Sequence, residues 1–198
     1  MFSPIHHTFG PHATFPYCIK AKLLILSPWK WKNGKDTEKI RTNLSYSMNG
    51  KCALFYSGRE ALFAILKSLN LSDNDEIIIQ GYTCSVVPNA IRAAGGNPIF
   101  ADIDINSLNL TKESTEEKIT ENTKAIICQH TFGLSADAES LRKLCDKKNI
   151  FLIEDCAHII PDKNDKSKIG KYGDCAFFSL GRDKAISGIT GGLVITRN

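Results

Sequence analysis

The chain has 198 residues, of which 42% are apolar and 23% are charged, and its formal net charge is +4. This length and composition are ordinary for one globular domain with a sizeable core. The lysines and arginines are dispersed and form no basic stripe interleaved with aromatic residues, so we expect no nucleic-acid partner.

Residues 1–50 differ from the rest of the chain. They hold most of the prolines, both tryptophans and three of the five histidines, and their apolar residues show poor periodicity. We therefore predict an irregular N-terminal arm with one short helix near 17–26. The apolar run at 23–26 is too short for a membrane span or a signal-peptide core, so we expect a cytoplasmic protein with no membrane partner.

Residues 51–198 show a regular pattern and are predicted to form one domain. Helices are predicted over 59–69, 85–94, 112–122 and 138–148, and strands over 76–80, 98–102, 124–128, 150–154, 174–178 and 192–196. Strands that alternate with helices predict an α/β fold with a mostly parallel central sheet flanked by helices. Ligands bind such sheets where the strands end, and Tyr82, His130, Asp155 and Ser179 all follow predicted strands.

The cysteine pattern argues against a metal site. Seven cysteines stand at positions 18, 52, 84, 128, 145, 156 and 175, and none forms a Cys-x-x-Cys pair. The histidines do not combine with them at zinc-binding spacing. We expect free thiols in a reducing compartment and no metal.

Lys184, Asp155 and Ser179 are the first candidate site residues. A lysine near glycines is most simply a solvated surface charge. A nucleophilic lysine instead needs a desolvated cavity that keeps its amine neutral. Nearby glycines would allow a flat cofactor to come close to such an amine. Asp155 follows an apolar strand, where a carboxylate is costly to bury alone. It either caps a helix, forms a salt bridge, or pairs with the ring nitrogen of pyridoxal phosphate (PLP). The order of carboxylate, hydroxyl and amine favours a PLP site.

Other positions allow both a binding role and a structural one. The run Ser57-Gly58-Arg59 begins a helix, where free N–H groups bind phosphate or where Ser57 simply caps the helix. Tyr82 either stacks on a planar ring or packs. His158 either contacts a ring hydroxyl or is a polar residue at a helix start, and His130 either lines the same crevice or makes a structural hydrogen bond. The glycine motifs of ATP and NAD sites are absent.

Together these motifs resemble the DegT/DnrJ/StrS family of PLP-dependent sugar aminotransferases of fold type I, over about residues 53–197. The stretches that carry the resemblance are Ser57–Leu62, Asp75–Ile79 with Tyr82-Thr83, Gly95–Asp104, Ile119–Ile126, His130–Gly133, Ile153–His158 and Gly173–Ser179, continuing through Lys184 to Gly191-Gly192.

The resemblance implies roles for the cofactor-binding residues. Ser179 and the backbone at Gly58 and Arg59 would hold the phosphate, and Tyr82 would stack on the ring. His158 stands where the family often has Gln beside the ring hydroxyl, and Arg59 stands where many members have Thr.

The resemblance also implies the chemistry. Lys184 would bind PLP covalently and move the proton, and Asp155 would pair with the ring nitrogen. A lysine at 184, where some relatives carry His and are dehydratases, argues for transamination. The expected reaction transfers an amino group, from glutamate, to a nucleotide-linked keto-sugar in amino-sugar and polysaccharide biosynthesis.

The length of the chain departs from the family. Members are nearly twice as long and form homodimers, so we expect a truncated chain that holds the large PLP-binding domain without the small C-terminal domain. The alternative is a non-catalytic PLP-fold remnant or interaction module that lacks a complete substrate site.

Overall fold

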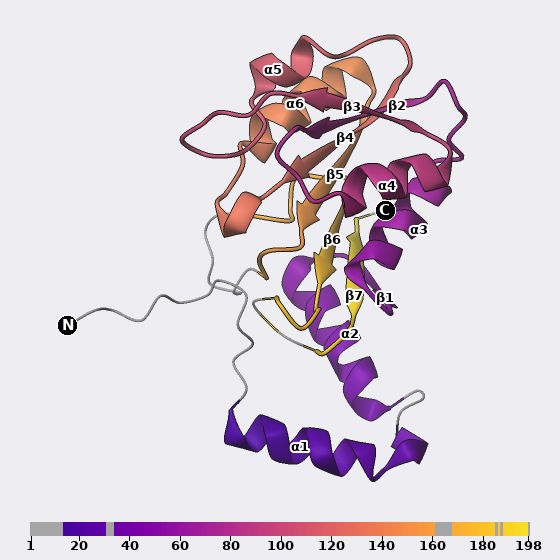
Figure 1. The fold of residues 1–198 in the computed structure, drawn as a ribbon, viewed down its shortest axis with the longest axis vertical. Helices are drawn as coiled ribbons and strands as arrows, with labels where there is room; N and C mark the ends of the chain where they lie inside the picture. The colour runs from indigo at the N-terminus through magenta and orange to yellow at the C-terminus, as the bar shows by residue number, and fades with distance from the viewer. Residues whose placement is uncertain (1–13, 31–33, 161–167, 185, 187, 198) are drawn as a thin grey trace, which may run out of the picture.

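A computed structural model describes residues 14–30, 34–160, 168–184, 186 and 188–197 (Figure 1). Its single sheet has the strand order β1-β7-β6-β5-β4-β2-β3. The strands are β1 Lys51–Phe55, β2 Glu76–Gln80, β3 Asn97–Ala101, β4 Thr123–Gln129, β5 Phe151–Cys156, β6 Cys175–Ser179 and β7 Gly192–Thr196. Strand β7 is antiparallel to both of its neighbours, and the other neighbouring pairs are parallel. The predicted mostly parallel α/β fold is confirmed.

Helices cover both faces of the sheet. They are α1 Phe15–Ile25, α2 Lys35–Met48, α3 Gly58–Ser68, α4 Val86–Ala94, α5 Lys112–Glu116 and α6 Ala138–Lys148, with short 3-10 turns at Pro28–Lys30 and Thr131–Gly133. Figure 1 shows α3 and α4 on one side of the sheet and α5 and α6 on the other. In strand β2, successive side chains point to opposite faces of the sheet: Ile77 and Ile79 pack with α3 and α4, whereas Ile78 packs with α6.

Local sequence signals set several helix ends. The side chain of Ser57 accepts a hydrogen bond from the N–H of Glu60 at the start of α3, and Asp137 does the same for Ser140 at the start of α6. Helix α4 ends at Gly95, whose φ of +104° lies in the left-handed region that favours glycine. These ends agree with the predicted ones, but α5 stops at Glu116 instead of continuing to residue 122.

The prediction of an irregular arm is wrong for residues 35–48. Helix α1 confirms the short helix expected near 17–26, but α2 is a second helix of 14 residues. Its Leu44 and Met48 pack against Phe178 and Leu193 of the sheet. Tertiary contact therefore stabilises a helix whose own pattern is weak. Expectations about residues 1–13 and 31–33 lie outside the described residues, and the division of the chain at residue 50 stays a prediction.

Strand β1 was not predicted either. It pairs with β7 along its whole length, from Lys51 opposite Thr196 to Phe55 opposite Gly192. This partner comes almost at the other end of the chain, so no local pattern announces the pairing. Within the described ranges, no helix is both long and apolar enough to cross a membrane.

Candidate active site

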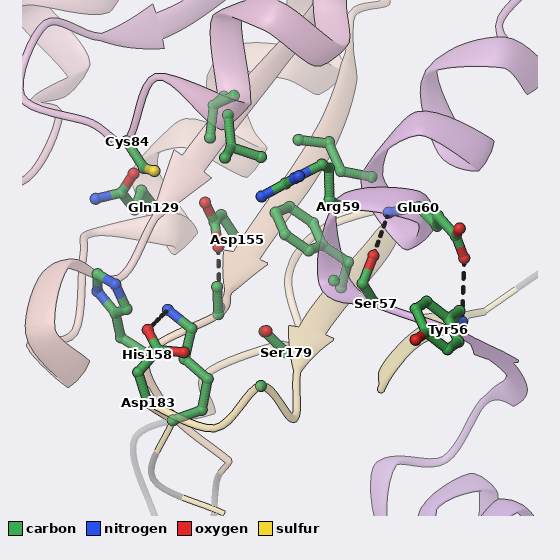
Figure 2. A pocket seen from close by; sticks show the side chains of 18 residues that line it. Tyr56, Ser57, Arg59, Glu60, Cys84, Gln129, Asp155, His158, Ser179 and Asp183 are labelled. Carbon is green, nitrogen blue, oxygen red and sulfur yellow. Dashed lines mark hydrogen bonds and ion pairs between the residues drawn. The ribbon is translucent and has the colours of Figure 1, made fainter. Parts of the chain in front are cut away.

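A cavity of about 550 Å³ lies where β5 and β6 end, next to the first turns of α3 and α4 (Figure 2). The sequence-predicted residues that line it are Gly58, Arg59, Asp155, His158, Ser179 and Lys184. The fold therefore brings together residues from α3, β5, β6 and the loops that follow these strands. One predicted site residue, Tyr82, is not among the lining residues.

The first turn of α3 offers backbone donors to the cavity. The N–H of Glu60 donates to the Ser57 side chain over 3.2 Å, and the N–H of Ala61 donates to the Ser57 carbonyl over 3.0 Å. The preceding N–H groups, at Gly58 and Arg59, come too early in the helix to have an intrahelical acceptor. Together with the positive end of the helix dipole, they suit an anion such as a phosphate.

Gly58 is required by the close approach of α3 to β6. A Cβ atom at this position would lie 2.8 Å from Cβ and 3.0 Å from Oγ of Ser179. Gly192 in β7 likewise lets the start of α3 come close, because a Cβ atom added at Gly192 would lie 2.2 Å from the carbonyl oxygen of Ser57. The glycines thus hold the start of α3 and the hydroxyl of Ser179 together in one cradle of N–H and O–H donors.

Asp155 is a buried carboxylate, 4% exposed, within β5. Burial raises its pKa to about 6, although the N–H of Ala157, which donates to Oδ1 over 2.9 Å, and the more distant His130 and Lys184 favour the ionised form. In the described part of the chain, no lysine or arginine lies within ion-pair distance of it. A carboxylate in this setting is suited to a cationic partner that enters the cavity.

Lys184 supplies an amine to the same cavity. Its side chain is only 16% exposed, and Nζ lies 3.5 Å from a carboxylate oxygen of Asp183. Its backbone N–H donates to the carbonyl of Gly181 over 3.1 Å. A largely shielded amine that faces a cavity with Asp155 on its wall is the arrangement that a nucleophilic lysine needs.

His158 follows β5 and also lines the cavity. Its Nδ1 accepts a hydrogen bond of 3.0 Å from the backbone N–H of Phe132. Burial, and then the charge of Lys184, lower its pKa, while Asp183 opposes this shift. The imidazole is thus held at the cavity wall in its neutral form.

Tyr82 and His130 lie outside the cavity. Tyr82 is 51% exposed, and its ring meets the ring of Phe132 edge to face with centroids 6.3 Å apart. His130 is buried, and its Nε2 lies 3.0 Å from a carboxylate oxygen of Glu154. For His130 the structural hydrogen bond, one of the two predicted alternatives, is the one observed.

The structure adds lining residues that the sequence did not single out, among them Glu60, Cys84, Gln129, Phe177 and Asp183. Gln129 ends β4, and its side chain accepts a hydrogen bond from the Thr83 hydroxyl over 2.6 Å. Its place at the end of a strand beside β5 is a signal that could have identified it. Cys84 lies in the loop between β2 and α4, where no local pattern indicates which side chain turns inward.

The described residues contain no group of three or more His, Cys, Asp or Glu side chains placed to hold a metal ion. The polar groups of the cavity include an amine, a buried carboxylate, a hydroxyl and helix N–H groups. This set is suited to an organic ligand that carries both an anionic group and a cationic ring nitrogen.

Known proteins share this fold and part of this sequence. The chain is 34% identical to the GDP-perosamine synthase of Vibrio cholerae over 173 residues, which cover 87% of the chain and 47% of that protein. An aminotransferase structure from Psychrobacter cryohalolentis superimposes with a TM-score of 0.86 at 28% identity, covering all of this chain and 50% of that one. The structure of NtdA from Bacillus subtilis with the cofactor PMP bound gives a TM-score of 0.83 at 26% identity, covering all of this chain and 45% of that one.

These comparisons agree in two respects. The chain spans about half the length of the curated relatives it matches. Residues 21–198 match the model of one family, the DegT/DnrJ/EryC1/StrS aminotransferases. The matched range contains the sheet, the helices on both of its faces and all the residues that line the cavity. The chain belongs to the DegT/DnrJ/EryC1/StrS aminotransferase family.

Proposed function

We propose that this chain is the PLP-binding part of a nucleotide-sugar aminotransferase. The observation that carries the proposal is that Asp155 and Lys184 line one cavity, together with the α3 cradle and Ser179. Asp155 is buried with a raised pKa, which fits a group that brings its own cationic nitrogen. The cradle fits a phosphate, and the shielded amine of Lys184 fits a covalent attachment to an aldehyde.

Each residue has a defined task in this proposal. When bound, PLP supplies an electron sink for the carbon that carries the amino group. Asp155 keeps a proton on the ring nitrogen, and the N–H groups of Gly58 and Arg59, with the hydroxyl of Ser179, bind the phosphate. Lys184 anchors the cofactor and then moves a proton at the reacting carbon. His158 lies beside this centre as a neutral imidazole.

The substrate class follows from the family and its named members. We infer an amino donor, glutamate, and an acceptor that is a keto-sugar linked to a nucleotide, because relatives include a GDP-perosamine synthase. We further propose that the protein acts as a homodimer in the cytoplasm. Its seven cysteines, all within the described residues, are free thiols, as expected in a reducing compartment.

The cofactor claim is tested by spectroscopy. The purified chain is incubated with PLP, and the visible absorption band of lysine-bound PLP is expected in the wild type and in Lys67→Ala, an exposed lysine of α3. The band is expected to vanish in Lys184→Ala. A band that persists in Lys184→Ala, or that never forms in the wild type, contradicts the proposal.

Turnover is tested separately. Glutamate added to the PLP-loaded chain is expected to yield pyridoxamine phosphate, measured by its fluorescence. A chain that binds PLP but never forms this product would instead be a non-catalytic module of the aminotransferase fold.

A further inference from the structure

The two sides of the cavity differ in what they offer to a flat ring. The sheet side contributes Asp155, Ala157 and Phe177. The helix side, formed by α3, α4 and the loop before α4, contributes Gly58, Arg59, Glu60, Leu62, Cys84, Val86 and Val87. None of these helix-side residues is aromatic, and the aromatic residue predicted for stacking, Tyr82, lies outside the lining. The aromatic ring of Tyr56, just before α3, also lines the cavity, but it lies beside Glu60 and away from Asp155 (Figure 2).

Two of these helix-side residues have planar side-chain groups, Arg59 and Glu60. The Glu60 carboxylate is turned away from Asp155 and accepts a hydrogen bond of 3.2 Å from the backbone N–H of Tyr56, so only the Arg59 group is directed at the ring site. Figure 2 shows the Arg59 side chain reaching from the first turn of α3 into the cavity, toward Asp155. Among the hydrogen bonds and ion pairs of the described residues, none involves the Arg59 guanidinium, whereas Arg142 is paired with both Asp146 and Asp174 at 2.8 Å. A cation in the first turn of a helix also opposes the helix dipole, so its position has a local cost.

We propose that the Arg59 guanidinium stacks on the ring of the bound cofactor, on the side away from the sheet, in the role that the family resemblance implied for Tyr82. A guanidinium group is flat and weakly hydrated, and it stacks on aromatic faces. Cys84 and the two valines of this wall cannot offer a planar surface. The inference rests on the proposed PLP function.

The direction of the side chain separates this role from phosphate binding. The cradle for the phosphate consists of helix N–H groups and Ser179, and Gly58 packs directly on Ser179. The Arg59 side chain instead extends toward Asp155, which would mark the ring nitrogen and therefore the opposite end of the cofactor (Figure 2). The guanidinium thus covers the ring, while only the backbone of Arg59 serves the phosphate.

The test measures binding of pyridoxamine phosphate, which cannot bond covalently to Lys184, by fluorescence titration. We expect Arg59→Leu and Arg59→Lys each to weaken binding about tenfold, because both remove the planar group. The inhibition constant of inorganic phosphate, measured as a competitor, should not change. The matched control is Arg92→Leu, which removes an exposed arginine of α4 outside the cavity lining and should leave both constants unchanged.

Each alternative has its own result. Wild-type affinity in Arg59→Lys would show that charge alone matters and would overturn the stacking role. A parallel loss of phosphate affinity in Arg59→Leu would assign the side chain to the phosphate instead. Thermal unfolding of each variant checks that it is folded. If Arg59→Leu proves unstable, the binding constants of Arg59→Lys alone test the stacking role. A wild-type chain that fails to bind pyridoxamine phosphate would refute the proposed function itself.

Discussion

The backbone N–H of Phe132 donates a hydrogen bond to Nδ1 of His158 over 3.0 Å, and the Phe132 ring stacks on the same imidazole with an interplanar angle of 5°. Because Nδ1 accepts this bond, the imidazole proton lies on Nε2. Phe132 achieves this geometry with φ of 52° and ψ of 21°, a left-handed conformation that costs an aromatic residue about 1–3 kcal/mol. A strained turn thus sets the tautomer of a residue at the cavity wall.

The tautomer of His158 can be observed directly by ¹⁵N NMR of histidine-labelled protein. We expect the Nε2–H form, with a pKa below the ordinary histidine value because burial disfavours the charged ring. As pH falls through this lowered pKa, protonation of Nδ1 breaks the bond to Phe132 and destabilises the folded state. Phe132→Gly keeps the left-handed turn and the N–H but removes the ring, so the pKa should rise while the tautomer stays. An Nδ1–H signal in the wild type would contradict this account.

Asp155→Asn should stabilise the ligand-free protein at alkaline pH. Burial raises the Asp155 pKa from 3.8 to about 6, so ionisation of Asp155 costs folding free energy as pH rises through this interval, and the full cost applies above it. The shift corresponds to about 3 kcal/mol. Denaturant unfolding at pH 8 should show a gain of this order, and unfolding near pH 3 should show almost none.

The same substitution should impair cofactor binding. Asparagine can still accept the hydrogen bond from the N–H of Ala157, but it offers no charge to a ring nitrogen. Affinity for pyridoxamine phosphate should fall at least about tenfold, a loss typical of a buried charge pair. A variant that binds pyridoxamine phosphate as tightly as the wild type would show that Asp155 does not pair with the ring nitrogen.

Gly58→Ala should destabilise the protein by about 1–3 kcal/mol, as expected when an added methyl group has no room. The new Cβ would lie 2.8 Å from Cβ of Ser179, a distance that requires α3 or β6 to move. Adding Ser179→Gly removes the clashing atoms and should recover part of the loss. Chemical denaturation of both single variants and the double variant gives the coupling energy, and strictly additive effects would argue against the contact.

Glu154→Gln should destabilise the protein by about 3–5 kcal/mol, because it removes a buried charge that several donors surround. Glu154 accepts hydrogen bonds from Nε2 of His130 and from the backbone N–H groups of Gly170, Tyr172 and Gly173. The NH2 group of a glutamine at this position would face N–H groups that also donate, so at least one of these hydrogen bonds would be lost. Denaturant unfolding at pH 7 measures the loss, and Glu113→Gln, an exposed glutamate of α5, should have almost no effect.

The pH dependence of Glu154 follows from the same contacts. Burial would raise its pKa, but the hydrogen bonds from His130, Gly173 and Gly170 outweigh this, and the pKa is lowered from 4.5. Its contribution to stability is therefore present above pH 4.5 and is lost as pH falls through the lower folded-state pKa. In Glu154→Gln, the loss of stability that comes from protonation of Glu154 at low pH should be absent. An acid-unfolding profile identical to that of the wild type would contradict this assignment.

The sequence by itself determined the elements whose signals are local. Helix α3 begins at the Ser57 cap, α4 ends at Gly95, and β2 and β4 appear as short apolar runs, because capping, left-handed glycines and apolar periodicity act within a few residues. The same locality placed Gly58, Asp155 and Ser179 at strand or helix ends, on one edge of a mostly parallel sheet, with Lys184 in the loop after β6.

Only the tertiary structure decided which side chains face the cavity from loops and which weak segments become regular. Strand β1 and helix α2 form because β7 and the side chains of β6 and β7 provide partners distant in sequence. In the loop between β2 and α4, the exposed Cys84 lines the cavity and Tyr82 does not, so Arg59 is the planar group that reaches toward Asp155 from that wall. A loop has no fixed side-chain period, so its orientation depends on packing against other elements, which the sequence does not encode locally.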